Sequence, residues 1–500
     1  MKLIQLSYVK NIISRHKGRP QQELAFCILV KNIAYEKLVE VHWAGEDHVW
    51  HVLPAEYHSS AGEDYEIWHA YALFHLSSHY SLPGNIEFAL HYHVRGRDYW
   101  DNNSSHNYFI DADSGIRLQE GFPLLNIDYQ PNLEQGQQFY PITVAVQHSR
   151  HFSQVYVHWT TDDWKTVHVT PCFFKRRHWD KVLWSNARNP NQYGCETWIS
   201  QLQIGHAYRV QYAIGGATPR RQIWDNNLGR NYIARRERLK VLTLNLHCYQ
   251  EEHQDHKFAQ IAKAIRDLNI DIVCLQEVGE PWNDGKGDWN ANAAKIIHDY
   301  LGPPYHVYTD WSHLGFDRYR EGVAILSKYK FLYKDAGYIS SSQDVYNIHA
   351  RKVVMVQVSV PYIGEINVFS THLSWWQDGF REQFERLRDW AQHKHDNHVR
   401  ATLLCGDFNA KAGSEGYKLL SYDYEDQFLK ANERRKFDKI FCQTPQPQMQ
   451  YLHHDGRIDY IFLKKGSRLT ATSAKELFTQ QDYYGRVSDH TGYYLEFEPT

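Results

Sequence analysis

The fold of the C-terminal half is decided by a recurring pattern, and its clearest copy is Ala401-Thr402-Leu403-Leu404-Cys405-Gly406-Asp407-Phe408-Asn409. The apolar run from Ala401 to Cys405 predicts a buried β-strand. Asp407 and Asn409 follow it directly, where the strand meets a loop. Loops carried by a rigid sheet are where binding and catalytic residues concentrate. An Asp at this place can also serve only to form a turn, so the segment alone leaves both interpretations open.

The same arrangement recurs along residues 238–500. Polar residues adjoin apolar runs at Leu244-Asn245-Leu246-His247, Leu275-Gln276-Glu277, Ser370-Thr371-His372-Leu373, Arg457-Ile458-Asp459-Tyr460 and Ser488-Asp489-His490. Between the first two runs, apolar residues recur at helical spacing over residues 258–268, and a second helix fits residues 380–393. Alternating strands and helices predict an α/β domain.

Oxygen donors dominate these strand ends. The carboxylates and amides of Asn245, Glu277, Asp407, Asn409 and Asp489 suit a hard divalent cation such as Mg²⁺ or Mn²⁺. Such a cation polarises a phosphoryl oxygen, and a histidine exchanges protons near neutral pH. Each residue alone is more often structural. Their combination, with His372 and His490, predicts the hydrolysis of a phosphoric ester.

Seven segments also carry a resemblance to a known family: LNLH, LQEV, EGVAILSK, STHLSWW, GDFN, RIDYIF and SDH. They resemble the endonuclease/exonuclease/phosphatase superfamily, which includes DNase I-like nucleases, sphingomyelinases and inositol polyphosphate phosphatases. The resemblance covers residues 238–500 and implies a DNase I-like, four-layer α/β sandwich. It implies a Mg²⁺-dependent (or Mn²⁺-dependent) hydrolase, a phosphodiesterase or nuclease or a phosphatase, and leaves the phosphate-ester substrate open, nucleic acid included.

The resemblance also implies roles for individual residues. Asn245, Glu277 and Asp489 would hold the metal. Asp407 would orient or deprotonate the attacking water, and Asn409 would hold a phosphate oxygen. His490 would contact the scissile phosphate with Asp459 fixing its tautomer, and His372 would be a second imidazole. Trp375, Trp376 and Phe380 either stack on the substrate or pack under the next helix, and Arg318, Arg320 and Arg351 are either phosphate ligands or ordinary charges. The sequence leaves these alternatives open.

The N-terminal half has a different pattern. Short runs of period two, such as Ile86–Val94, predict antiparallel sheets. Trp100-Asp101-Asn102-Asn103, with Asn107-Tyr108 after it, is repeated as Trp224-Asp225-Asn226-Asn227 with Asn231-Tyr232, at an offset of 224 − 100 = 124. This repeat predicts a duplicated module, with two all-β immunoglobulin-like sandwiches over residues 20–112 and 136–234.

The first copy resembles carbohydrate-binding module family 21, through the segment Val30–Lys37 and the Trp-Asp-Asn-Asn end. The second copy departs from that pattern, since Val146-Gln147-His148 stands where a Lys-Asn pair is expected. The resemblance implies binding of glycogen or a starch-like α-glucan. The candidate sugar-binding residues are Trp100, Asn102, Asn103, Tyr108, Trp224, Asn226, Asn227 and Tyr232. The alternative is that the Asp-Asn-Asn runs form turns and the aromatic rings belong to the core.

Composition sets broad limits. Lys+Arg 55 against Asp+Glu 58 gives a net charge of −3, which does not point to nucleic acid. The start has no signal-peptide pattern, the seven cysteines are sparse, and no apolar run is long enough for a membrane span, so we expect a cytoplasmic protein. Two hypotheses remain: a Mg²⁺-dependent phosphoester hydrolase targeted to glucan by tandem modules, or a non-catalytic glucan-binding scaffold with an inactive phosphoesterase domain.

Overall fold

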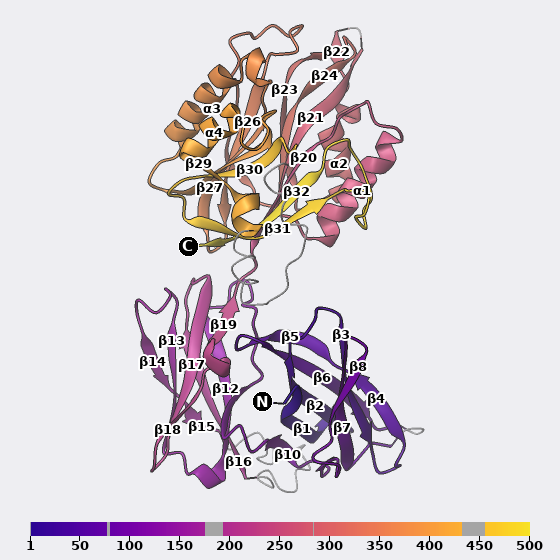
Figure 1. Ribbon diagram of the computed structural model, residues 1–500, viewed down its shortest axis with the longest axis vertical. Helices are drawn as coiled ribbons and strands as arrows, with labels where there is room; N and C mark the ends of the chain where they lie inside the picture. The colour runs from indigo at the N-terminus through magenta and orange to yellow at the C-terminus, as the bar shows by residue number, and fades with distance from the viewer. Residues whose placement is uncertain (1, 78–80, 176–193, 284, 433–455) are drawn as a thin grey trace. The chain divides into compact units, whose positions relative to one another are not determined.

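The chain folds into two compact units, Met1–Glu237 and Arg238–Thr500. Figure 1 draws the computed structural model, which describes residues 2–77, 81–175, 194–283, 285–432 and 456–500. The N-terminal unit is built from strands, and the C-terminal unit from strands and helices. Among the described helices, none has the length and apolar character that crossing a membrane requires.

The first half of the N-terminal unit is a sandwich of two sheets. One sheet has the order β10-β1-β2-β6-β5, and the other has the order β4-β3-β7-β8 with β9 also paired to β7. The strands are β1 (Ile4–His16), β2 (Arg19–Lys31), β3 (Lys37–Ala44), β4 (Trp50–Pro54), β5 (Glu56–Ala61), β6 (Tyr65–His75), β7 (Ile86–Val94), β8 (Arg97–Asp101), β9 (Tyr108–Ile110) and β10 (Gly115–Leu118). Alternate residues of β7, such as Phe88 and Leu90, face β2 residues such as Phe26 in a shared core.

The first sandwich begins at Ile4 and not at residue 20, because β1 pairs with β2 along its whole length. The polar residues Gln5 and Ser7, which interrupt the apolar run in the sequence, occupy alternate positions of this strand. Leu6 and Val9 lie in the core. The finer expectation of an immunoglobulin-like topology stays a prediction.

The second sandwich repeats the strand order of the first. Its sheets have the orders β11-β12-β16-β15 and β14-β13-β17-β18, with β19 also paired to β17. The strands are β11 (Leu124–Ile127), β12 (Phe139–Gln147), β13 (Gln154–Thr160), β14 (His168–Pro171), β15 (Phe173–Phe174), β16 (Cys195–Gln203), β17 (Arg209–Ala217), β18 (Gln222–Asp225) and β19 (Tyr232–Arg235). Every strand of the first sandwich except β10 has a counterpart here, so the duplication extends from the sequence to the topology.

The C-terminal unit contains two larger sheets. The first has the order β23-β24-β21-β20-β32-β31 with β22 on β21, and the second has the order β25-β26-β27-β28-β30-β29. The strands are β20 (Leu239–Asn245), β21 (Ile272–Asn283), β22 (Lys286–Gly287), β23 (His306–Gly315), β24 (Tyr319–Ser327), β25 (Phe331–Tyr338), β26 (Lys352–Val360), β27 (Gly364–His372), β28 (Val399–Asp407), β29 (Tyr424–Asp426), β30 (Asp459–Lys464), β31 (Leu469–Leu477) and β32 (Gly492–Pro499). The helices are α1 (Gln254–Asp267), α2 (Ala293–Leu301), α3 (Phe380–Lys394) and α4 (Glu415–Asp423).

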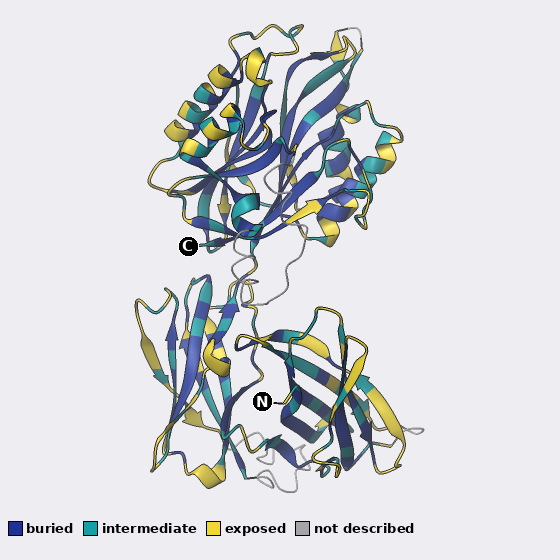
Figure 2. Ribbon diagram, in the orientation of Figure 1, coloured by how far each residue is buried: buried dark blue, intermediate teal, exposed yellow. Residues whose placement is uncertain are grey.

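Three apolar layers hold this unit together. Residues such as Val241, Val356 and Leu403 fill the space between the two sheets. Helices α1 and α2 cover the outer face of the first sheet, and α3 and α4 cover the outer face of the second. Figure 2 shows the sheets buried and the outer sides of the helices exposed. The result is the predicted four-layer α/β sandwich of DNase I-like type, in which the ends of the central strands carry the polar residues.

Candidate active site

Six side chains meet where the central strands of both sheets end. Asn245 ends β20, Glu277 lies in β21, His372 ends β27, Asp407 ends β28, Asp459 begins β30, and His490 precedes β32. Glu277 sits at an irregularity in the pairing of β21 with β24 and has a positive φ of 47°. A bulge of this kind turns a side chain away from the regular alternation of the strand. It directs Glu277 toward the strand ends of the second sheet.

Asn245 joins the two sheets. Its Nδ2 donates to Glu277 Oε1 at 2.9 Å and to Asp407 Oδ2 at 3.1 Å, and its Oδ1 accepts from the His247 backbone N–H at 3.0 Å. The sequence predicted a metal ligand at this position. In the structure the amide nitrogen faces the carboxylates, so Asn245 positions Glu277 and Asp407 and does not present its oxygen beside theirs.

The half-buried Glu277 and the buried Asp407 form an acidic pair with His372. One ligand atom of each of the three lies within 4.8 Å of the others. Burial, and then the charge of Asp459, raises the pKa of Asp407 to about 8, while burial and Glu321 raise the pKa of Glu277. Carboxylates that oppose one another out of water are stabilised by a cation. The donor set therefore fits a divalent metal, held by Glu277 and Asp407.

His490 is held by Asp459. Its Nδ1 lies 2.7 Å from Asp459 Oδ2, and its Nε2 lies 3.8 Å from Asp407 Oδ2. Burial lowers the pKa of His490, but the hydrogen bond and the charge of Asp459 outweigh it and raise that pKa to about 9. The second oxygen of Asp459, Oδ1, is buried and accepts no hydrogen bond from the described part of the chain. The pair places a cationic imidazole beside the acidic residues, with its Nε2 facing Asp407 and Asp489.

His372 has the opposite character. Burial, and then the charge of Arg351, lowers its pKa well below the usual range, so the ring is neutral. Asn409 Nδ2 donates to His372 Nε2 at 3.2 Å and to the Leu373 carbonyl at 2.8 Å. Asn409 was predicted to hold a phosphate oxygen. Both of its amide hydrogens are directed at protein atoms here, so its evident role is to orient His372.

Asp489 lies apart from this cluster. It is half-exposed and belongs to a second group with His247 and Glu251, whose Nδ1 and Oε1 atoms are 2.9 Å apart. Its distance from His490, 4.0 Å between Oδ1 and Nε2, places it at the rim. The structure therefore places Glu277 centrally and Asp489, the other carboxylate predicted as a metal ligand, at the rim, while Asp407, predicted to act on the attacking water, lies beside Glu277.

Three aromatic residues follow His372. Phe380 is fully buried among the residues that α3 packs against, while Trp375 and Trp376 are each 43% exposed. Arg320 lies between the rings of Trp282 and Trp311 and pairs with Glu280, so it is not a free phosphate ligand. Packing accounts for Phe380, and the two tryptophans remain candidates for substrate contact.

The predicted sugar-binding residues divide into two groups. Trp100 is 50% exposed and Trp224 is 43% exposed, and the amides of Asn102, Asn103 and Asn226 lie on exposed turns beside them. Tyr108 and Tyr232, by contrast, are 6% and 3% exposed. Their hydroxyl groups donate to Asp101 and Asp225 at 2.8 Å, so the two tyrosines are core residues and a sugar ring cannot stack on them.

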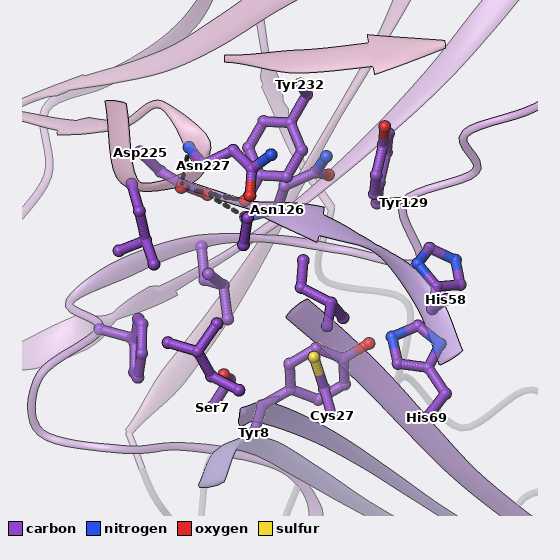
Figure 3. A pocket seen from close by; sticks show the side chains of 16 residues that line it. Ser7, Tyr8, Cys27, His58, His69, Asn126, Tyr129, Asp225, Asn227 and Tyr232 are labelled. Atoms are coloured by element: carbon purple, nitrogen blue, oxygen red, sulfur yellow. Dashed lines mark hydrogen bonds between the residues drawn. The ribbon is translucent and has the colours of Figure 1, made fainter. Parts of the chain in front are cut away.

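Asn227 is also unavailable on the outer surface. It is buried, and its Nδ2 donates to the Ser60 carbonyl of the first sandwich at 3.1 Å. Figure 3 shows Asn227 with Asp225 and Tyr232 on one side of a pocket whose other side carries His58 and His69. This residue therefore joins the two sandwiches, a contact between segments 167 residues apart that the repeat alone did not reveal.

Comparison with known sequences agrees with this geometry. Residues 242–490 match the profile of the Endonuclease/Exonuclease/phosphatase family, and residues 6–111 match that of Carbohydrate/starch-binding module (family 21). The C-terminal unit carries an endonuclease/exonuclease/phosphatase domain. The N-terminal unit carries one family 21 module, in its first sandwich. The second sandwich has the same strand order as the first.

Relatives exist for both parts. The uncharacterized protein YbhP of Escherichia coli is 27% identical over 265 residues, which cover 50% of this chain and 92% of that protein. Glucoamylase 1 of Rhizopus oryzae is 38% identical over 90 residues, 17% of this chain and 14% of that enzyme. Among solved structures, an endonuclease/exonuclease/phosphatase family protein from Leptotrichia buccalis is similar, with 25% identity, coverage of 52% of this chain and 99% of that one, and a TM-score of 0.43.

The endonuclease/exonuclease/phosphatase domain contains a carboxylate that sequence reasoning missed, Glu321, and an arginine whose role the sequence left open, Arg351. Glu321, on β24, raises the pKa of Glu277, and it pairs with His313 at 3.4 Å. Arg351 is screened from solvent near the same carboxylates, which lie close enough to act on its pKa, and no described hydrogen bond reaches its Nε. Glu321 opens the quoted EGVAILSK segment, so a carboxylate before an apolar run was the available signal.

Proposed function

We propose that the C-terminal domain is a Mg²⁺-dependent phosphoric ester hydrolase and that the sandwich unit targets it to glycogen or a starch-like α-glucan. The observation that carries the enzymatic part is the junction of two sheets at which Glu277, Asp407 and the His490–Asp459 pair meet. A non-catalytic scaffold has no need of a half-buried and a buried carboxylate beside an Asp-held histidine, because a charged group costs stability when it is taken out of water.

Glu277 and Asp407 are the residues that would hold the cation. When bound, Mg²⁺ supplies positive charge to a phosphoryl oxygen and to the leaving oxygen. Asn245 fixes the positions of the two carboxylates relative to each other, because its amide group donates a hydrogen bond to each. Because Asn245 links β20 to the end of β28, a change in the spacing of the two sheets would move both carboxylates.

His490 and Asp407 act on the ester itself. The cationic His490 offers Nε2–H to a phosphate oxygen, while Asp459 keeps the other ring nitrogen protonated. Asp407, beside Glu277 and His372, would orient the attacking water next to the cation. His372 stays neutral and is oriented by Asn409, so it accepts or donates a hydrogen bond without adding charge.

The glucan part of the proposal rests on the exposed indoles of Trp100 and Trp224. The flat C–H face of a pyranose ring stacks on such a surface, and nearby amides donate to and accept from its hydroxyl groups. Two such surfaces on one chain give avidity only where a polymer reaches both of them. Binding should therefore be stronger for glycogen than for a short oligosaccharide.

Nicking of supercoiled plasmid with Mg²⁺, beside hydrolysis of a small phosphomonoester, tests the enzymatic proposal. His490→Ala should lower turnover by at least about 10²-fold, the usual contribution of a group that handles a proton. His256→Ala, an exposed histidine on α1, is the matched control and should leave the rate unchanged. Nicking by the wild type would assign a nuclease, and monoester hydrolysis alone would assign a phosphatase.

A metal-binding measurement distinguishes an inactive scaffold from an active enzyme whose substrate was not among the esters assayed. Mg²⁺ should raise the melting temperature of the C-terminal unit, because a ligand that binds the folded state stabilises it. Glu277→Ala should remove this rise, while Glu252→Ala, at an exposed position, should keep it. The absence of a Mg²⁺ effect together with no turnover on either ester would reject the enzyme and support the scaffold.

A further inference from the structure

A second cluster of ligand-type side chains lies on the outer face of the first sandwich. Glu40 and His42 are two residues apart on β3, so both point to the same side of the sheet. His91 on β7 is the direct cross-strand partner of Glu40. The register of these two strands therefore sets three side chains side by side, none of which takes part in the core.

The distances within this cluster suit a tetrahedral metal. Glu40 Oε2 lies 3.0 Å from His91 Nδ1 and 3.4 Å from His42 Nε2, and the three ligand atoms all lie within 4.8 Å of one another. Ligand atoms around tetrahedral Zn²⁺, at about 2.0–2.2 Å from the ion, are about 3.3–3.5 Å apart. A small contraction or expansion of these side chains reaches that geometry. We propose that Glu40, His42 and His91 bind a transition-metal ion of the Zn²⁺ class, with solvent at the fourth position.

Asp98 completes the arrangement from behind. Its Oδ1 lies 2.8 Å from His91 Nε2 and also 2.8 Å from His93 Nδ1. A carboxylate on the far nitrogen of a metal-binding histidine fixes the ring orientation and strengthens the near nitrogen as a ligand. Asp98 holds the proton of His91 at Nε2, which leaves Nδ1 to face the position of the ion. Two imidazoles and one carboxylate favour Zn²⁺ over Mg²⁺, which prefers oxygen ligands throughout.

The cluster also contacts the proposed glucan surface. The His91 ring stacks on Trp100 with centroids 4.4 Å apart, and the His42 ring meets the same indole edge-on at 4.8 Å. An ion that fixes both imidazoles therefore fixes the rings on which Trp100 rests. The proposal concerns metal binding and does not depend on glucan binding or on phosphoester hydrolysis.

The second sandwich provides an internal comparison. Strand registers place Tyr156 at the position of Glu40, His158 at that of His42 and Gly215 at that of His91. Gln222 takes the place of Asp98. His158 still meets Trp224 edge-on at 5.0 Å, but the part of the chain that the structure describes places no second imidazole and no carboxylate in a ligand group with it. The chain therefore offers the same surface once with the full ligand set and once with a single histidine.

Titration of the full chain with Zn²⁺ in a buffer containing Mg²⁺, followed by calorimetry, tests the proposal. His91→Ala should bind one Zn²⁺ per chain fewer than the wild type. His158→Ala is the matched control and should bind as many as the wild type. Any Zn²⁺ taken up by the C-terminal domain is the same in all three proteins, so the difference belongs to the first sandwich.

A second variant tests the site in case His91→Ala fails to fold. Asp98→Asn keeps all three ligands and should weaken the Zn²⁺ affinity by about 10–100-fold, as loss of such a supporting carboxylate does. Co²⁺ as a probe should give the intense visible absorption of a four-coordinate site in the wild type and not in His91→Ala. Equal Zn²⁺ stoichiometry in the wild type and His91→Ala, or an equal loss in His158→Ala, would overturn the proposal and leave Glu40, His42 and His91 as an ion-pair network.

Discussion

The two sandwiches of the N-terminal unit share a strand order but differ in what they present to solvent. In both, a Trp-Asp-Asn-Asn segment ends a strand, and the Asp accepts a hydrogen bond from the Tyr seven residues later. In both, that Asp also accepts from a backbone N–H of the first strand, Leu6 in one and Asn126 in the other. The outer faces around Trp100 and Trp224 have diverged, since a Glu and a His of the first are replaced by a Tyr and a Gly.

This difference shows which residues of the repeat are structural and which belong to the outer surface. The repeated segments, Trp-Asp-Asn-Asn with Asn-Tyr, contain the Asp and the Tyr whose hydrogen bonds connect the end of one sheet to the first strand of the sandwich. We call the Asp, the Tyr and the backbone N–H of the first strand the clamp. The residues that distinguish the two surfaces stand on β3, β7 and their counterparts, outside the repeated letters. The residues that are identical in the two copies therefore form the clamp. The residues that differ lie on the outer surfaces around Trp100 and Trp224.

Breaking the shared clamp should have the largest effect. Tyr108→Phe and Tyr232→Phe each remove a hydrogen bond to a buried carboxylate, which should lower the free energy of unfolding by about 1.5–3 kcal/mol. Calorimetric unfolding of the full chain measures the shift. Tyr35→Phe, at a ring that is 98% exposed, is the control and should change nothing. If only one of the two variants is destabilised, the clamps are not equivalent.

Converting the second surface into the first should come next. Gly215→His alone should destabilise the second sandwich by about 1–3 kcal/mol through overpacking, because a Cβ there would lie 2.4 Å from the Tyr156 ring. Adding Tyr156→Glu should relieve the clash and rebuild the three-ligand set. The double variant should bind one additional Zn²⁺ in a calorimetric titration. No gain over the wild type would count against the assignment of one Glu and two His as the ligand set.

The exposed indoles should have a smaller and more nearly equal effect. Trp100→Ala and Trp224→Ala should each weaken binding of a short maltooligosaccharide at their own surface by about fivefold, or about 1 kcal/mol of lost contact. Retention on glycogen should fall further in the double variant, since both surfaces then fail to reach the polymer. Sedimentation with glycogen measures this. A loss in one sandwich alone would show that the other copy has ceased to bind glucan.

A pH effect should be the smallest and belong to the first sandwich. Burial, and then the neighbouring His58, lowers the pKa of His69 to about 4, so the unfolded chain binds more protons than the folded one between about pH 4 and about pH 6.5. Stability should therefore fall as the pH drops, by less than about 1 kcal/mol between about pH 7 and about pH 6. The second sandwich has Ile199 at the corresponding position. His69→Gln should flatten the dependence in calorimetry, and an unchanged slope would contradict this origin.

Much of the fold followed from the sequence because the signals were local. Period-two runs such as Ile86–Val94 and the helical spacing from Phe258 to Leu268 are properties of single segments, and the structure has a strand and a helix there. The start of the first sandwich was wrong because Gln5 and Ser7 interrupt the apolar run of β1. Leu6 and Val9 enter the core only once β2 pairs with this segment, with an irregularity in the pairing between Leu6 and Tyr8.

The site followed only in its outline. Residue types at strand ends identified Glu277, Asp407 and His490, but the orientation of an amide depends on partners far along the chain. Asn245 has its nitrogen, not its oxygen, toward the carboxylates because these groups accept hydrogen bonds. One of them, Asp407, lies 162 residues away along the chain, so no local pattern could show this. Tyr108 looked like a sugar-binding ring because aromatic residues serve both surfaces and cores, and its hydrogen bond to Asp101 is a tertiary fact.

The bond from each Asp back to the first strand of its own sandwich has an evolutionary meaning. The backbone N–H, the Asp and the Tyr of each set lie within one continuous segment, from Leu6 to Tyr108 in one copy and from Asn126 to Tyr232 in the other. A duplicated stretch of the gene that spans those limits carries a complete folding unit with it. One copy could then keep its hydrogen-bonded frame while its outer face accumulated changes.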